Sequence, residues 1–314
     1  MRYVKDLKEG YAVQDVYLCK TKNSATTKNG KEYINVILGD KTGNVDCKIW
    51  NADSFGINEF EPKDYVYING EVKSFNGAIQ IDIKQIRKAD ESEYEVADFI
   101  PTTKKDVEEM YDSILKCVSQ VSNNYLHALL EEFFVNDKEL IEKFKLSSAA
   151  KSIHHNFAGG LAEHTLGVAR LCAFYCKQYP AINQDLLLTS ALLHDIGKIY
   201  EFTEFPENEY SDEGNLLGHI IIGIEMVTEK AKLIPDFPTD TLNQVKHCIA
   251  AHHGKLEFGS PKKPGIIEAM ALSYADDTDA KMQTFTQFLE DSENYDWTYI
   301  KAFEGSIRMT KNLQ

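Results

Sequence analysis

The sequence predicts a two-domain protein, in which a small all-β barrel at the N-terminus is followed by an all-α domain. The chain has 314 residues, a length typical of two compact domains. Apolar residues alternate with period two over residues 11–88, whereas after Pro101 they recur at the spacing of amphipathic helices. The acidic stretch KADESEYEVADFIPTT separates the two patterns. We therefore expect a barrel at 1–90, a linker at 91–103 and a helical domain at 104–314.

The N-terminal domain carries the signals of several short strands. YINVILGDKTGNVDCKIW predicts a strand, a turn at Asp-Lys-Thr-Gly-Asn and a second strand. DYVYINGEVKSFNGAIQIDI repeats this form, with Asn69-Gly70 and Asn76-Gly77 as breaks. We count about five strands, which in so short a segment favour a small closed barrel, and the OB-fold is the natural candidate.

The second half has the periodicity of helices. KKDVEEMYDSILKCVSQV is amphipathic, and Thr102 or Thr103 is expected to cap its first turn. Further helical patterns cover approximately 123–135, 138–146, 160–178, 184–196, 216–233, 239–252 and 265–290.

Composition narrows the class of protein. The net charge of −15 argues against a protein that coats nucleic acid non-specifically. Residues 1–90 hold 14 basic and 13 acidic residues, so the remaining residues hold 20 basic and 36 acidic ones. Because the negative charge lies in the second part of the chain, any contact with nucleic acid must be local. The six cysteines are scattered without a C-x-x-C pair, and the chain shows neither a signal peptide nor a long apolar run. We therefore expect a cytoplasmic protein without a membrane segment.

Imidazole and carboxylate groups recur on five successive predicted helices, mostly near a helix end. These groups are His164, His194 with Asp195, His219, His252 with His253, and Asp276. Buried histidine and aspartate side chains are costly unless they are paired or bound to metal, and the helix around LLLTSALLHDIGK is strongly apolar. Such ligands suit Mn²⁺, Fe²⁺ or Zn²⁺, and the lack of thiolates disfavours a structural zinc site.

His194 and Asp195 are neighbours, so their side chains would point about 100° apart on a regular helix. Both can reach one ion only where the helix ends, and we expect Gly197 to allow that ending. An aspartate at such a point can bridge two ions through its two oxygens.

The order H…HD…H…HH…D, over about 150–290, resembles the HD superfamily of metal-dependent phosphohydrolases. The most specific part is HD followed by Ile-Gly-Lys, with the flanking histidines and the later Ala-Asp. The resemblance implies that a first ion is held by His164, His194, Asp195 and Asp276. For two-metal members it implies a second ion, held by His219 and one histidine of the pair His252 and His253, with Asp195 bridging.

Two choices stay open within this resemblance. We favour His252 over His253 as the ligand, and Asp276 over Asp277 and Asp279 because it follows alanine, as in the family motif.

Three residues are candidates for direct catalytic roles. Lys198 lies one turn past His194, where its charge would stabilise phosphoryl oxygens; a surface lysine is the alternative. A turn at Gly159-Gly160 could return His155 over the metals, although a helix-capping role is the alternative. His253 is the third candidate.

The barrel supplies candidates for nucleic-acid binding. OB barrels commonly present aromatic and cationic side chains to single strands, and the loop KTKNSATTKNGK has four lysines and no acid. That loop is either a phosphate clamp or an ordinary solvated loop, and some of the aromatics must be barrel core. The candidates are Lys22, Lys28, Lys31, Tyr33, Lys48, Trp50, Tyr65, Tyr67, Lys73 and Phe75.

The order of barrel, acidic linker and HD domain resembles the YhaM-type 3′–5′ exoribonucleases of Gram-positive bacteria over nearly the full chain. The matching segments include NGKEYINVILGDKTGNVDCKIW, HHNFAGGLAEHTLGVA, ALLHDIGKIYEF and AHHGKLEFGSPKKPGIIEAMALSYADDTDAKM. The resemblance implies an exonuclease that favours Mn²⁺, with Fe²⁺, Zn²⁺ or Co²⁺ as alternatives. It also implies single-stranded RNA and some single-stranded DNA as substrates, nucleoside 5′-monophosphates as products, and a homo-oligomer, with a hexamer as one option.

Two other functions compete with this interpretation. An HD-domain nucleotidase or cyclic-nucleotide phosphodiesterase would use the barrel as a regulatory module, but no G-Y-P follows HHG, which disfavours the cyclic-dinucleotide branch. A non-catalytic single-strand-binding protein with a relic HD site is disfavoured by the intact set of ligands.

Overall fold

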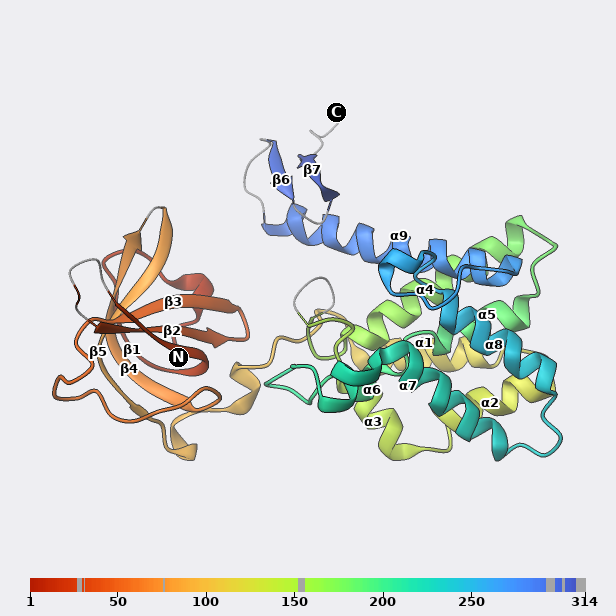
Figure 1. Cartoon of the computed structure of the whole chain (residues 1–314), viewed down its shortest axis with the longest axis horizontal. Coiled ribbons are helices and arrows are strands. Elements are labelled where there is room, and N and C mark those ends of the chain that lie inside the picture. The colour runs from red at the N-terminus through yellow and green to blue at the C-terminus, as the bar shows by residue number, and fades with distance from the viewer. Residues whose placement is uncertain are drawn as a thin grey trace. The chain divides into compact units, whose positions relative to one another are not determined.

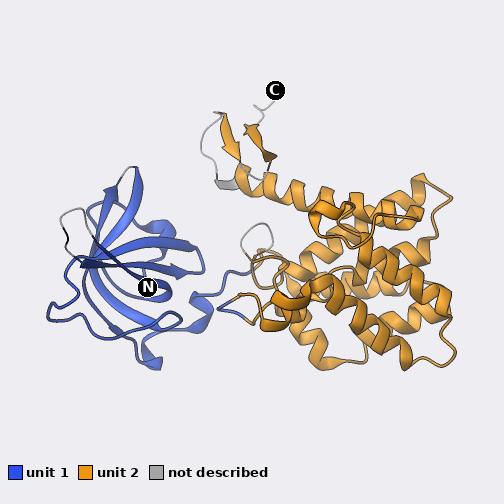
Figure 2. Cartoon of the chain, in the orientation of Figure 1, with its two compact units in different colours: residues 1–102, 205–207 blue, residues 103–204, 208–314 orange. Residues whose placement is uncertain are grey.

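The structure is a computed structural model that describes residues 1–26, 30, 32–75, 77–151, 156–291, 297–300 and 303–308, without the side chains of 290 and 291. The chain divides into two compact units (Figure 2). One unit comprises Met1–Thr102 with Phe205–Glu207, and the other comprises Thr103–Glu204 with Asn208–Gln314.

The first unit is a closed five-stranded barrel with the strand order β1-β2-β3-β5-β4 (Figure 1). Its strands are β1 (Ala12–Thr26), β2 (Glu32–Asp40), β3 (Gly43–Ile49), β4 (Tyr65–Phe75) and β5 (Ala78–Lys88). Neighbouring strands are antiparallel except for β3 and β5, which pair in parallel. Alternate residues of β3, namely Val45, Cys47 and Ile49, point into the core. The predicted OB-fold is therefore confirmed.

The segment predicted as a linker differs from that expectation, because residues 91–102 pack with the barrel unit. It contains the 3₁₀ turns η2 (Glu91–Glu93) and η3 (Val96–Asp98). Phe99 is buried against the barrel, and Asp98 accepts hydrogen bonds from the Tyr3 hydroxyl and the Lys41 ammonium, both at 2.7 Å. These contacts were not predicted from the sequence because the segment is acidic, which is typical of a solvated linker.

The second unit is helical, as predicted. Its helices are α1 (Val107–Val118), α2 (Asn124–Phe134), α3 (Lys138–Leu146), α4 (Gly160–Gln178), α5 (Gln184–Leu193), α6 (Lys198–Glu201), α7 (Asp212–Lys232), α8 (Thr239–Ala251) and α9 (Ile267–Asp291). The hairpin of β6 (Thr298–Ile300) and β7 (Gly305–Ile307) follows α9 and was not predicted. No helix in the described part of the chain is both long and apolar enough to cross a bilayer.

Local sequence explains where these helices begin. Asp106, Asn123 and Asn183 each accept hydrogen bonds from backbone N–H groups of the first turn, so they cap α1, α2 and α5. The expectation that Thr102 or Thr103 caps α1 is wrong, because Asp106 occupies that position and the Thr103 hydroxyl donates to Glu163 instead. One apolar core joins α1–α9, and Ile199 is the contribution of α6.

Candidate functional site

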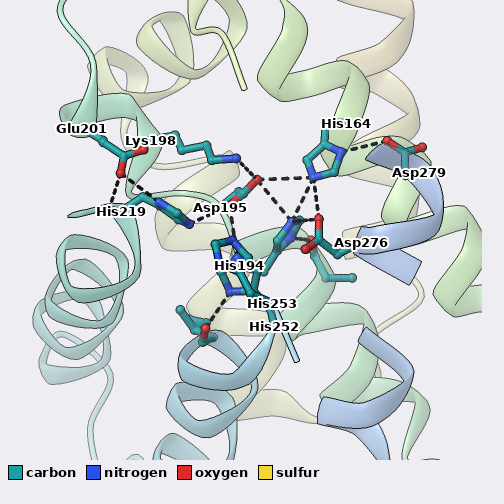
Figure 3. Close-up of polar contacts among 12 residues, drawn as sticks. His164, His194, Asp195, Lys198, Glu201, His219, His252, His253, Asp276 and Asp279 are labelled. Atoms are coloured by element: carbon teal, nitrogen blue, oxygen red, sulfur yellow. Dashed lines mark hydrogen bonds and ion pairs between the residues drawn. The ribbon is translucent and has the colours of Figure 1, made fainter. Parts of the chain in front are cut away.

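The imidazoles and carboxylates singled out in the sequence converge in the helical unit (Figure 3). His164 lies in the second turn of α4, Asp276 lies within α9, and the remaining residues lie at helix breaks. His194 and Asp195 follow the last residue of α5, and His252 and His253 follow the last residue of α8. His219 comes directly after a break in α7, where Gly218 has φ +72°. Because the chain turns at these points, side chains from five helices can meet.

The turn that carries His194 and Asp195 differs in detail from the sequence-based expectation. The chain leaves α5 at Leu193, as required for both side chains to point inward. Gly197, however, has φ −65°, which any residue can adopt. Its role is close packing, since a Cβ there would lie 2.1 Å from the carbonyl oxygen of His219. Gly197 therefore allows α6 to pack against α7 and does not provide a special backbone conformation.

All five imidazoles present the same nitrogen to the centre of the cluster. The Nδ1–H groups donate outward to oxygens: His164 to Asp279 (2.8 Å), His194 to Ala191 O (2.8 Å), His219 to Glu201 (2.9 Å), His252 to Ile249 O (2.7 Å) and His253 to Phe258 O (2.8 Å). In the neutral tautomer, each ring therefore directs the lone pair of Nε2 inward. This arrangement is typical of metal-binding histidines.

The first group of candidate ligand atoms belongs to His164, His194 and Asp276. The two Nε2 atoms lie 3.3 Å apart, and Oδ1 of Asp276 lies 3.1 Å from Nε2 of His164. Facing lone pairs at such a distance repel each other unless a cation or a proton lies between them. A divalent ion satisfies all three atoms at once.

The second group consists of His219, His252 and His253. The structure brings both members of the His252–His253 pair to this group, so the geometry does not single out His252. His252 is fully buried, whereas His253 is partly exposed at the edge of the cluster. Burial, followed by the charge of His253, holds the pKa of His252 well below its usual range, which keeps the ring neutral and able to bind a metal.

Asp195 lies between the two groups. Its Oδ2 is 3.3 Å from Nε2 of His164 and 3.4 Å from Nε2 of His194, whereas its Oδ1 is 3.5 Å from Nε2 of His219 and 3.6 Å from Nε2 of His252. One carboxylate thus presents an oxygen to each group, as a ligand that bridges two ions would.

Unsatisfied atoms supply an independent test of the fit to metal. Oδ1 of Asp195 and the Nε2 atoms of His219 and His252 are buried and have no hydrogen-bond partner within the described ranges. Leaving several buried polar atoms unpaired is costly. A divalent ion among them removes that cost, so the residues present fit a second ion as well as a first.

Lys198 is not the surface lysine considered as an alternative. Its Nζ donates to Oδ2 of Asp195 at 2.7 Å, and only 15% of its side chain is exposed. Burial opposes ionisation of Asp195, but the ammonium of Lys198 and the nearby imidazole of His194 outweigh it and hold the pKa of Asp195 well below its usual range. The same pairing raises the pKa of Lys198 despite burial, so both groups are charged.

A cavity of about 270 Å³ opens over the cluster. It is lined by Ala149, His164, Lys198, His253, Phe258, Asp276, Asp277 and Ala280. Lys198 and both groups of candidate ligands therefore face the same small space. His155, the remaining catalytic candidate, lies outside the described residues.

Sequence reasoning missed the residues that hold the histidines in place. Oε1 of Glu201 accepts from both the backbone N–H and Nδ1 of His219, each at 2.9 Å. Asp279, considered only as a rival ligand, lies behind His164, and Gly167 leaves room for it, because a Cβ there would lie 2.1 Å from the Asp279 carboxylate. Asp277 instead pairs with Lys281 on α9, at the edge of the cavity. The buried Glu201 in HDIGKIYEF was the one sequence signal available.

On the barrel, several of the candidate nucleic-acid residues form one patch. The register places Lys48 between Asn35 of β2 and Asp82 of β5. The rings of Tyr33 and Trp50 lie 5.1 Å apart, and the Lys48 ammonium lies 5.6 Å from the centre of the Tyr33 ring. Asp82 links Trp50 (3.0 Å) to Lys73 (2.6 Å). We call Tyr33, Lys48, Trp50 and Lys73 the barrel face.

Other barrel candidates lie elsewhere or have other partners. Tyr65 stacks on Tyr94 at 4.0 Å and contacts the edge of Phe99, so it belongs to the packing of residues 91–102. The ring of Tyr67 lies under Arg87. Lys22 donates to the Phe60 carbonyl and pairs with Glu61. Phe75, at the end of β4, is 64% exposed, and Lys28 and Lys31 lie outside the described residues.

Comparison with known families agrees with both units. A model of the HD domain matches residues 161–281, and a model of the OB-fold nucleic acid binding domain matches residues 19–89. Fold and site thus define an enzyme that joins an HD phosphohydrolase domain, whose side-chain groups fit divalent metal, to an OB-fold domain.

Relatives over nearly the whole chain identify the family. The chain is 34% identical over 284 residues to "3′-5′ exoribonuclease YhaM" of Bacillus subtilis (strain 168), covering 90% of this chain and 88% of that protein. It is 33% identical over 278 residues to the protein of the same name from Geobacillus sp. (strain WCH70), covering 88% and 85%. The protein therefore belongs to the YhaM family.

Among solved structures, the second OB-fold domain of replication protein A from Methanococcus maripaludis matches 29% of this chain and 95% of that one. The identity is 18% and the TM-score is 0.23, which is too low to add to the assignment.

Proposed function

We propose that this protein is a metal-dependent 3′–5′ exoribonuclease that hydrolyses single-stranded RNA, and single-stranded DNA as a secondary substrate, to nucleoside 5′-monophosphates. The observation that carries the proposal is the carboxylate of Asp195, which faces one group of inward-directed ligand atoms with each oxygen. Membership of the YhaM family and the barrel face support the choice of substrate.

The chemistry follows from the donor atoms. Two divalent ions at these groups would lower the pKa of a water molecule and neutralise the charge of a phosphodiester. Manganese is our proposed ion, with Fe²⁺, Zn²⁺ or Co²⁺ as alternatives, because the ligand groups of the described residues contain imidazoles and carboxylates and no thiolate.

The chain itself orients and stabilises the reacting groups. Water adds to phosphorus, the bond from phosphorus to the 3′ oxygen breaks, and the phosphate leaves on the 5′ oxygen of the released nucleotide. The shortened RNA takes up a proton and ends in a 3′ hydroxyl. Lys198 is charged and faces the cavity, so we assign it to stabilising the phosphoryl oxygens in the transition state.

We further propose that the protein is a cytoplasmic homo-oligomer. All six cysteines are free, as expected for a reducing compartment. Light scattering of the purified protein measures its mass in solution, and a monomer would contradict the second part of this proposal.

The function is tested with 5′-labelled single-stranded RNA, the purified protein and Mn²⁺, with EDTA as the metal-free arm. We expect a ladder that shortens from the 3′ end, nucleoside 5′-monophosphates on chromatography, and no reaction in EDTA. Hydrolysis of free nucleotides without RNA shortening would support the small-nucleotide alternative. Binding without turnover would support the non-catalytic alternative.

A further inference from the structure

The loop between α8 and α9 carries an aromatic residue at the edge of the cavity. Phe258 is the last residue of the 3₁₀ turn η4 (Leu256–Phe258), and Gly259, with φ +90°, turns the chain directly after it. The carbonyl oxygen of Phe258 accepts the hydrogen bond from Nδ1 of His253 at 2.8 Å. The backbone of Phe258 is therefore tied to a histidine of the second ligand group.

Phe258 is also accessible. It is 57% exposed although it lines the cavity together with His253, Lys198 and Asp276. A large apolar side chain held at the rim of a polar cavity suits a ligand that has both an apolar face and a charged group. A nucleotide combines these properties in its base and its phosphate.

Lysines accompany this aromatic residue. The ammonium of Lys255 lies 4.9 Å from the centre of the Phe258 ring and 4.0 Å from the Glu257 carboxylate. The segment KLEFGSPKK (255–263) contains three lysines and one glutamate, although residues 91–314 carry 20 basic and 36 acidic residues. An aromatic ring beside cations is the combination that single-strand-binding grooves use for bases and phosphates.

We propose that Phe258 is the stacking platform for the base of the 3′-terminal nucleotide, with Lys255 beside it to contact a backbone phosphate. This proposal rests on the exoribonuclease function proposed above. Stacking on one ring holds any of the four bases, so the subsite fixes the terminal nucleotide without reading its sequence. The terminal phosphodiester is thereby held over the candidate metal centre, and RNA is trimmed one nucleotide at a time.

The experiment compares two RNA oligonucleotides that differ only at the 3′ terminus, where one has an ordinary base and the other an abasic ribose. Phe258→Ala should lower kcat/KM on the ordinary oligonucleotide by about tenfold, because one aromatic–base stack is lost. The same change should leave kcat/KM on the abasic oligonucleotide unaltered. Phe258→Trp should retain wild-type discrimination between the two.

Controls separate stacking from structural damage. The hydrogen bond to His253 uses the backbone carbonyl of Phe258, so the alanine variant keeps it, and bound metal should equal that of wild type. Phe174→Ala removes a phenyl group that is 54% exposed on α4 and should change neither substrate. Equal losses on both oligonucleotides, or no loss on either, would overturn the stacking role. Wild-type protein that degrades neither oligonucleotide in Mn²⁺ would overturn the exoribonuclease proposal, and this one with it.

Discussion

The candidate metal centre and the barrel face both present rings and charged side chains to a ligand. They differ in how firmly the surrounding structure fixes those side chains. In the helical unit, five imidazoles are each fixed by an Nδ1 hydrogen bond, and His194 and His252 have no exposed surface. On the barrel, Trp50 is 41% exposed and its partners are other surface side chains. A buried centre loses its function when one ligand is removed, whereas an exposed face loses affinity in steps.

The largest effect is expected at Asp195, because it faces both ligand groups. Asp195→Asn keeps the shape of the side chain but removes its charge, so we expect turnover below detection and a loss of bound metal. Activity on RNA, metal content and circular dichroism are measured together. Asp112→Asn, a change at an exposed aspartate on α1 that does not line the cavity, serves as the control. A folded Asp195→Asn protein with normal metal content would refute the bridging role.

A smaller effect is expected at Lys198, which faces the cavity. Removing one group that stabilises transition-state charge typically slows catalysis by about 10²–10³-fold. Lys198→Ala should show this loss in single-turnover cleavage of a short RNA while retaining metal, and Lys198→Arg should recover only part of it. If the variant cleaves within about threefold of the wild-type rate, the loss is too small for a side chain that contacts the phosphoryl group. Loss of metal would show that Lys198 acts mainly through Asp195.

Glu201 tests whether the outward hydrogen bonds matter for the metal centre. Glu201→Ala removes the acceptor of Nδ1 of His219, and the loss of such a partner typically weakens metal binding or activity by about 10–100-fold. Metal titration followed by activity should show a higher metal requirement, with near-normal turnover at saturation. Glu213→Ala, at an exposed glutamate of α7, is the matched control. Unchanged metal affinity would contradict the positioning role.

The smallest effect is expected on the barrel face. Trp50→Ala should weaken binding of single-stranded RNA by about tenfold, the value of one aromatic–base stack, and leave hydrolysis of a dinucleotide unchanged. Tyr65→Ala should instead lower the melting temperature, because Tyr65 packs against Tyr94 and Phe99. Titration with labelled RNA and thermal unfolding separate the two outcomes. If Tyr65→Ala weakens RNA binding more than Trp50→Ala does, RNA does not bind to the barrel face.

Local patterns were sufficient to predict much of the fold. Alternation with period two identified the barrel, and helical periodicity identified α2, α3, α4 and α8 almost to the residue. These patterns reflect which side of each element is buried, and that is a local property of the chain. The break at Gly218 was not predicted, and the helix end near Gly197 was expected for its backbone conformation, whereas Gly197 is required by close packing between α6 and α7.

The sequence by itself determined the types of the candidate ligands and the helical segments that carry them, since histidine and aspartate in an apolar segment need a partner wherever the chain folds. Tertiary structure alone decided which atoms meet. It placed Asp195 between the two groups and paired Asp195 with Lys198. It also brought Glu201 and Asp279 into hydrogen-bonding distance of His219 and His164. Such contacts join residues from different helices, up to 115 positions apart for His164 and Asp279, and no local pattern encodes them. The barrel shows the same limit, because alternation places Tyr65 and Trp50 alike on the outside, and only the packing of residues 91–102 covers one of them.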